Sequence, residues 1–192
     1  MVRIEKEHFS LKQICESGQC FRLELLEETE GQRGKVSRRY GLVAFGKYLM
    51  VSQCGSYVEF FCSREEFDSI WKGYFDLTED YGRLIASIDP GDDYLCRAAA
   101  FGSGIRILRQ DLWEMIISFI VSQQNNIKRI RRCIELLCRT YGIKEKTPKG
   151  DTYYTFPTPE ALMGASLDDL YACNLGYRSR YIKETARMVC EG

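Results

Sequence analysis

The sequence has 192 residues, of which 45% are hydrophobic and 28% are charged, and 27 basic side chains balance 27 acidic ones. This composition excludes an intrinsically disordered chain, and no apolar run reaches the roughly 18 residues that a membrane-spanning helix needs. Nine cysteines without a CxxC pair, with a single histidine, do not match a zinc site. We therefore expect a cytoplasmic, intracellular protein with reduced thiols and with no bound metal or cofactor.

The first half of the chain predicts β-strands. They are expected at residues 21–25, 40–45, 48–53 and 57–62. Hairpin-length connections join the last three into an antiparallel meander, whereas residues 27–39 are polar and predict a loop. Ser63 and Glu66 have the spacing of a capping box, which predicts a helix that runs through residue 71 and covers one face of the sheet.

The second half of the chain predicts helices. Apolar side chains recur at helical spacing over residues 111–122 and 127–141, and Asn126 is the expected N-cap of the second helix. Gly142 is placed to end that helix, and a loop is expected at residues 144–156. Further helices are expected after the caps Thr158 and Ser166 and over residues 178–190.

These elements predict an α+β protein with two parts. The first is an antiparallel twisted β-sheet lobe with covering helices over residues 1–104, and the second is an all-α lobe over residues 105–192. Although the whole chain is neutral, residues 109–139 carry six basic and three acidic side chains. The basic excess therefore lies on the helical part of the chain.

Four consecutive amides, Gln123 to Asn126, lie where two of the expected helices meet, and Lys128, Arg129, Arg131 and Arg132 follow them. A helix N-terminus flanked by cations favours phosphate. Amides present a donor and an acceptor together, which suits the edge of a nucleic-acid base. A plain alternative stays open, in which Asn126 caps its helix, the other amides are solvated and the arginines cover a wet face.

Two further stretches carry suitable chemistry. In Asn174-Leu175-Gly176-Tyr177-Arg178-Ser179-Arg180-Tyr181, aromatic and cationic residues follow a glycine turn and could fill a gap in a base stack. In Ser17-Gly18-Gln19-Cys20-Phe21-Arg22, the glycine allows a backbone to approach a ligand closely. Taken alone, the first stretch could be a helix stop whose Tyr177 packs into the core, and the second could be a simple loop-to-strand turn.

Together and in this order, these stretches resemble the 8-oxoguanine DNA glycosylase family of the helix-hairpin-helix superfamily, over nearly the whole chain. The resemblance lies in "FSLKQICESGQCFRL", the 40–62 meander, "YFDLTEDYGRLIASID", "GIRILRQDLWEMIISFIVSQQNNIKRIRRCIELLCRTYG" and "LGYRSRY". It implies base-excision repair by a DNA N-glycosylase with abasic-site lyase activity. The implied partner is double-stranded DNA containing a damaged purine, and the implied setting is prokaryote-like and nucleoid-associated.

The resemblance also implies roles for individual residues. Gln124, Asn125 and Asn126 would lie in the gap that the extruded nucleotide leaves, and Arg129 would hydrogen-bond the estranged cytosine. Tyr177 would wedge beside that base and Arg178 would support it. Gly18 would present its carbonyl to the flipped purine, because oxidised guanine carries a hydrogen on N7 where guanine has a bare acceptor. At one of these seven positions the chain departs from the family. The family often has three consecutive asparagines at the junction, whereas Gln124 takes the first of those places here.

A second departure concerns catalysis. The family's helix-hairpin-helix, its lysine nucleophile and its catalytic aspartate follow the tyrosine–arginine segment, but after Tyr181 no Gly-x-Gly hairpin with a following lysine occurs. Lys183 lies on an ordinary amphipathic helix and is not assigned as the nucleophile. We therefore expect the first two-thirds of a glycosylase, which contains no catalytic residue and is inactive by itself. The alternatives are an alkylated-base glycosylase, a non-catalytic DNA-binding module and an unrelated α+β protein.

Overall fold

The structure is a computed structural model that describes residues 1–31 and 34–192, and its contacts divide the chain into two compact units. The first unit contains Met1–Leu42 and Leu49–Arg109, and the second contains Val43–Tyr48 and Gln110–Gly192. The main boundary thus lies after Arg109. The short segment Val43–Tyr48, which contains a turn between two strands, is grouped with the second unit. The domain boundary predicted after residue 104 stays a prediction.

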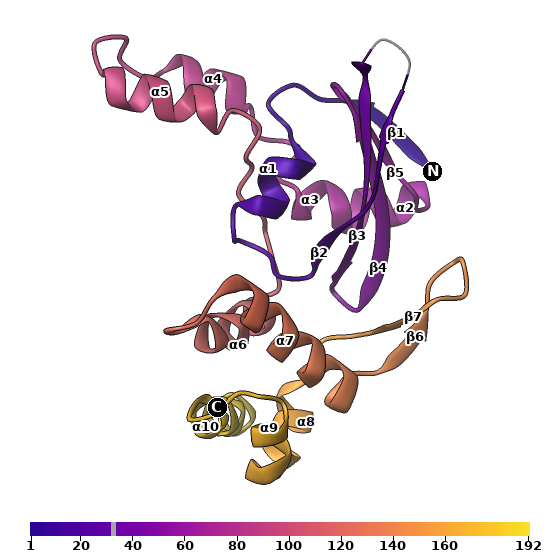
Figure 1. The fold of residues 1–192 in the computed structure, drawn as a ribbon, viewed down its shortest axis with the longest axis vertical. Coiled ribbons are helices and arrows are strands. Elements are labelled where there is room, and N and C mark those ends of the chain that lie inside the picture. Colours follow the sequence, from indigo (N-terminus) through magenta and orange to yellow (C-terminus); the bar gives the residue numbers. More distant parts are fainter. Residues whose placement is uncertain (32–33) are drawn as a thin grey trace. The chain divides into compact units, whose positions relative to one another are not determined.

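Five strands form one sheet in the order β1-β5-β4-β3-β2 (Figure 1). They are β1 (Val2–Glu5), β2 (Leu23–Glu30), β3 (Val36–Ala44), β4 (Lys47–Cys54) and β5 (Tyr57–Phe60). The edge strands pair antiparallel with their neighbours, β1 with β5 and β2 with β3. The predicted α+β class and antiparallel sheet are confirmed, whereas β1 was not predicted from the sequence.

The loop predicted at residues 27–39 is wrong at residues 27–30 and 36–39, where β2 and β3 extend as a two-stranded ribbon, and its residues 32–33 lie outside the described residues. Across the ribbon, Arg39 Nη1 lies 2.7 Å from Glu27 Oε2, and Arg38 forms an ion pair with Glu28. Opposite charges on facing strand positions each contribute roughly 0.2–1 kcal/mol. The facing side chains of the two strands are therefore charged here. For this reason the sequence lacks the alternation of apolar and polar residues that would predict a strand.

The first unit also contains helices. They are α1 (Leu11–Glu16), α2 (Arg64–Glu66), the π-helical turn η2 (Phe67–Trp71), α3 (Lys72–Tyr74), α4 (Tyr81–Ala86) and α5 (Asp93–Phe101). Helix α1 contacts β2, whereas α4 and α5 bury none of their residues. The predicted cap is confirmed, since Ser63 Oγ accepts a 3.1 Å hydrogen bond from the Glu66 N–H. The Phe60 ring of β5 contacts Phe67 and Phe75 edge-on, with centroids 5.0 and 5.7 Å away. These rings form the core beneath the sheet.

The second unit is mainly helical. Its elements are α6 (Leu112–Ser122), α7 (Ile127–Tyr141), β6 (Lys144–Lys146), β7 (Thr152–Tyr154), α8 (Pro159–Gly164), α9 (Leu167–Ala172) and α10 (Arg178–Glu191). The caps Asn126, Thr158 and Ser166 each accept a backbone N–H from the first turn of their helix, as predicted. Helix α10 packs against α8, α9 and α6. The segment predicted as a loop at residues 144–156 instead contains the β6–β7 hairpin.

Three chemical features of the described residues bear on function. No helix among them has the length and apolar character needed to cross a membrane. Within the described ranges, no three His, Cys, Asp or Glu side chains gather as metal ligands. The nine cysteines, all of which the structure describes, form no disulfide.

Candidate nucleic-acid interface

The amide segment forms a tight turn between α6 and α7. Gln123 ends α6, and Gln124 adopts a left-handed conformation with φ of 48°. The Asn125 side chain holds the turn, because its Nδ2 donates to Val121 O at 3.0 Å and its Oδ1 accepts the Asn126 N–H at 3.0 Å. With Asn125 bound in this way to the chain's own backbone, the exposed amides are those of Gln123, Gln124 and Asn126.

Asn126 also fixes the start of α7. Its Oδ1 accepts the Arg129 N–H at 3.0 Å, which directs the first turn of the helix. Lys128, Arg129 and Arg132 are exposed around this end. The partial positive charge of the helix N-terminus adds to these cations, so the first turns of α7 present a surface that attracts phosphate.

Arg178 connects this turn to the start of α10. Its side chain is buried, with 5% of the residue exposed, yet among the described residues its hydrogen-bond partners are carbonyl oxygens and no carboxylate. The guanidinium donates to Gln123 O from both Nε, at 3.1 Å, and Nη2. It also donates to Gln124 O and Leu175 O, each at 3.3 Å. The amide turn and the 175–178 turn are therefore joined through one cation.

Tyr177 lies at the exposed side of this joint. The residue is 50% exposed, its ring stacks under the Arg178 guanidinium at 4.6 Å, and it contacts the Tyr181 ring edge-on at 6.1 Å. A hollow of about 310 Å³ beside it is lined by Phe119, Ile120, Gln123, Tyr177, Arg178, Tyr181 and Thr185. The tyrosine ring is thus held against a cation on one side and, being 50% exposed, keeps another part available for a base.

A buried thiol lies between the two cationic segments. Cys133 of α7 donates to Asn174 O at 3.4 Å, just before the 175–178 turn. Burial raises the pKa of the Cys133 thiol, while the positive charges of Arg129 and Arg178 oppose that rise. Both arginines therefore act electrostatically on the same buried thiol in the second unit.

Gly18 lies in the first unit, in the turn between α1 and β2. It is exposed and left-handed, with φ of +79°, and a Cβ there would meet no atom within 4 Å. The left-handed conformation, and not crowding, is what requires glycine at this position.

The second unit therefore brings together six of the predicted site residues: Gln124, Asn125, Asn126, Arg129, Tyr177 and Arg178. Sequence reasoning missed Phe119, which matches the apolar period of α6 but is 69% exposed beside Tyr177. Tyr181 belongs to the predicted aromatic and cationic stretch but was assigned no role of its own, although its spacing of four residues from Tyr177 on a helix is a usable signal. Lys183 Nζ donates to Ala165 O at 2.6 Å, within the helical packing.

Comparisons with known proteins match this chain from end to end. The family model for the N-terminal domain of 8-oxoguanine DNA glycosylase matches residues 1–116, and that for the HhH-GPD superfamily base excision DNA repair protein matches residues 117–190. The N-glycosylase/DNA lyase of Saccharomyces cerevisiae is 30% identical over 199 residues, which cover 96% of this chain and 50% of the yeast protein.

Two solved structures are also similar. One is MBOgg1 in complex with a low-affinity DNA ligand, with a TM-score of 0.86 and 38% identity over 99% of this chain and 63% of that one. The other is the Clostridium acetobutylicum 8-oxoguanine glycosylase/lyase in complex with double-stranded DNA containing cytosine opposite 8-oxoG. Its TM-score is 0.85, with 35% identity over 100% of this chain and 66% of that one. The chain thus spans about half the length of the yeast relative and about two-thirds of these structures.

Proposed function

Because the chain belongs to the 8-oxoguanine DNA glycosylase family, we propose that its gene product works in base-excision repair as an 8-oxoguanine DNA N-glycosylase with abasic-site lyase activity. Its partner is double-stranded DNA that contains a damaged purine, in a cytoplasmic, nucleoid-associated setting. The observation that carries the proposal is the Arg178 joint, which holds the amide turn next to Tyr177. Amides, cations and an aromatic ring are the groups that a protein needs at a gap in a base stack.

The amide turn and the 175–178 turn have different roles on the undamaged strand. Extruding the lesion leaves an unpaired cytosine and a hole in the stack, at a cost of a few kcal/mol. Gln124 and Asn126 enter the hole with donors and acceptors, and Asn125 keeps their turn in shape through its bond to Val121. Arg129 hydrogen-bonds the cytosine, and Tyr177 stacks beside it. Arg178 does not contact the DNA but holds both turns in place, through its hydrogen bond to Gln124 O and its contact with the Tyr177 ring.

Recognition of the lesion itself falls to Gly18 in the first unit. Oxidised guanine has an N7–H donor, which a fixed Gly18 carbonyl accepts. Normal guanine has a lone pair at N7, which the same carbonyl repels. The selectivity is a difference between two affinities, and it depends on how well the carbonyl is held in place.

Cleavage of the glycosidic bond requires groups beyond those assigned here. In the proposed reaction a neutral lysine attacks C1′ of the sugar and displaces the base, and cleavage of the C1′–O4′ bond then opens the ring to an imine that permits β-elimination. An aspartate stabilises the positive charge that develops on the sugar. We assign neither role to a residue of this chain, since the Lys183 ammonium is bound to Ala165 O. The 192 residues accordingly bind the damaged site without turnover.

Two assays test the proposal. The full-length gene product should release 8-oxoguanine opposite cytosine and should leave 3-methyladenine in a matched duplex, whereas the reverse preference would favour an alkylated-base glycosylase. Borohydride trapping on the 8-oxoguanine duplex should give a covalent complex with the full-length product and none with residues 1–192. A trapped complex with the 192-residue chain would refute the proposal that it lacks the nucleophile.

A further inference from the structure

The Gly18 carbonyl needs an external support, because the glycine supplies none. Its backbone is left-handed, and a Cβ built there would meet no atom within 4 Å apart from its chain neighbours. On its N-terminal side, Ser17 closes α1 by donating from Oγ to Ile14 O at 2.7 Å. The C-terminal side must be held as well, since a peptide plane that is anchored at one end can still rotate.

Gln19 holds that second side through its amide. Its Nε2 donates to Arg106 O at 3.0 Å, and its Oε1 accepts the Leu108 N–H at 3.1 Å. The same Nε2 lies 3.1 Å from Ser17 Oγ, which also accepts the Gln19 backbone N–H at 3.4 Å. The two residues that flank Gly18 are therefore tied to each other and to the backbone at residues 106–108.

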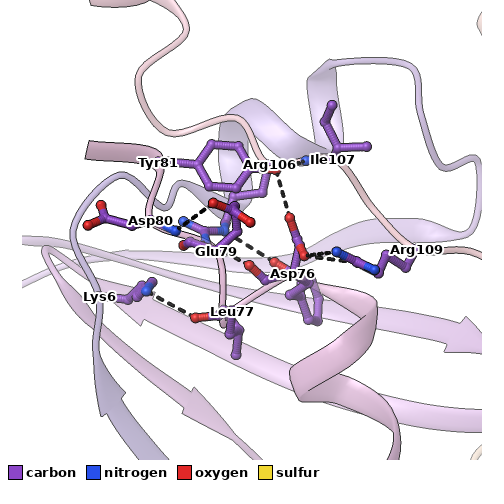
Figure 2. A network of polar contacts seen from close by, with 10 residues as sticks. Lys6, Asp76, Leu77, Glu79, Asp80, Tyr81, Arg106, Ile107 and Arg109 are labelled. Atoms are coloured by element: carbon purple, nitrogen blue, oxygen red, sulfur yellow. Dashed lines mark hydrogen bonds and ion pairs between the residues drawn. The ribbon is translucent and has the colours of Figure 1, made fainter. Parts of the chain in front are cut away.

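That backbone is itself firmly anchored. Arg106 is fully buried, and its guanidinium donates to four carbonyls, those of His8, Phe75, Asp76 and Glu79, at 2.7–3.2 Å. Figure 2 shows the guanidinium beside the Tyr81 ring, 4.0 Å from its centroid. In the same view Asp76 binds Arg109, at 2.8 Å from Nη2, so both ends of the 106–109 segment are fixed.

We propose that Gln19 is a positioning residue for lesion discrimination: its amide bridge to the 106–108 backbone fixes the peptide that presents the Gly18 carbonyl to the purine N7. The proposal rests on the proposed function, because it needs Gly18 to face the flipped base. Gln19 touches neither base nor sugar in this account. It sets the direction of the carbonyl, so it affects the difference between 8-oxoguanine and guanine more than the affinity for DNA as such.

The chain offers a matched control in Gln13. Its amide makes the same kind of bridge, with Nε2 donating to Phe101 O at 2.6 Å and Oε1 accepting the Gly104 N–H at 2.8 Å. It lies on α1 in the same unit, but it is not adjacent to Gly18. Gln13→Met and Gln19→Met therefore each remove an amide bridge to two backbone groups and keep a side chain of similar length, while only the second also removes the bond to Ser17 Oγ and frees the Gly18 peptide.

The experiment measures binding by the full-length gene product to duplexes that contain 2′-fluorinated 8-oxo-deoxyguanosine or 2′-fluorinated deoxyguanosine opposite cytosine. Fluorine at C2′ destabilises a positive charge at C1′ and so preserves the glycosidic bond during the measurement. Gln19→Met should lower the ratio of the two affinities about tenfold, the factor that one hydrogen bond represents in a binding equilibrium. Gln13→Met should keep the wild-type ratio. Gln19→Glu retains the acceptor for Leu108 N–H but loses the donor to Arg106 O, and it should give an intermediate ratio.

The outcomes separate the two proposals. If wild type binds both duplexes equally, the proposed function fails and this inference fails with it. If wild type discriminates and Gln19→Met keeps the full ratio, the inference alone is overturned. An equal loss in Gln13→Met would also overturn it, because the cause would then be a general loosening of the first unit. Should Gln19→Met not fold, Gln19→Glu decides by the same criteria.

Discussion

Replacing Arg178 with methionine removes the guanidinium that joins the two turns of the candidate interface, while it keeps the aliphatic part of the side chain. Four hydrogen bonds to three carbonyls are lost, those of Gln123, Gln124 and Leu175. Hydrogen bonds to a charged group each contribute about 1.5–3 kcal/mol. Because Arg178 is only 5% exposed, solvent screening reduces this contribution little.

The net effect is smaller than the sum of these bonds. Gln123 and Gln124 are exposed residues, so water can replace the guanidinium at their carbonyls, and the buried Leu175 carbonyl still accepts the backbone N–H of residue 178 at 3.3 Å. Removing a buried charge also returns part of its desolvation cost. We expect a loss of about 3 kcal/mol in the free energy of unfolding, which lowers Tm by about 6–12 °C for a chain of this size.

Thermal unfolding followed by circular dichroism measures this loss, and Arg180→Met is the control, since Arg180 is an exposed arginine on the same helix. A surface change of that kind should alter stability by about 0.5 kcal/mol or less. DNA affinity should fall as well, because the Gln124 turn is no longer held next to Tyr177. If Arg178→Met and Arg180→Met unfold at the same temperature, the joint does not hold the interface together.

Three other predictions address separate parts of the chain. Tyr177→Ala should leave Tm almost unchanged, since the residue is 50% exposed, but should weaken binding to a duplex with an abasic site by about 1–3 kcal/mol, the contribution of one stacked base. Tyr171→Ala changes a tyrosine of α9 that is 41% exposed and is the control in fluorescence anisotropy titrations. Equal losses in both variants would contradict a stacking role. Arg106→Met should lower the free energy of unfolding in urea by about 4 kcal/mol, because four carbonyls lose a buried charged donor, and a change under 1 kcal/mol would show that water replaces it. Burial, with the Glu66 carboxylate adding to it, raises the pKa of the Cys62 thiol from 9.0 to about 11. The stability that this thiol contributes is therefore fully present below pH 9 and is lost as pH rises through 11. Alkylation at a series of pH values, followed by mass spectrometry, should show Cys62 reacting with a pH midpoint near 11 in the folded protein and near 9 in urea. A midpoint near pH 9 in the folded protein would refute the shift.

The sequence predicts the elements whose signals are local. Asn126 is recognisable as a cap because its side chain needs only the N–H of Arg129, three residues away. The amides and cations of the interface are recognisable for the same reason, since each stretch is contiguous. The burial of Arg178 could not be predicted, because its partners Gln123 and Gln124 are more than fifty residues away in the chain.

The missed features share a physical cause, which is contact between distant segments. The β2–β3 ribbon has polar residues on both faces, and its register depends on pairs such as Arg39 with Glu27. Gln19 appears in the sequence as an ordinary loop residue, and only the fold brings its amide to the backbone of Arg106 and Leu108. Period and composition cannot report such contacts, whereas a resemblance to a family carries them implicitly.

The account depends most on the claim that the joined turns occupy the gap in the duplex opposite an extruded purine. A crystal structure of the full-length gene product with a duplex containing 2′-fluorinated 8-oxo-deoxyguanosine opposite cytosine tests this directly. The account predicts Arg129 within hydrogen-bonding distance of the estranged cytosine, the Tyr177 ring stacked beside it, and the Arg178 guanidinium still bound to the Gln123 and Gln124 carbonyls. A complex in which this surface faces solvent, and another face of the protein enters the gap, would contradict it.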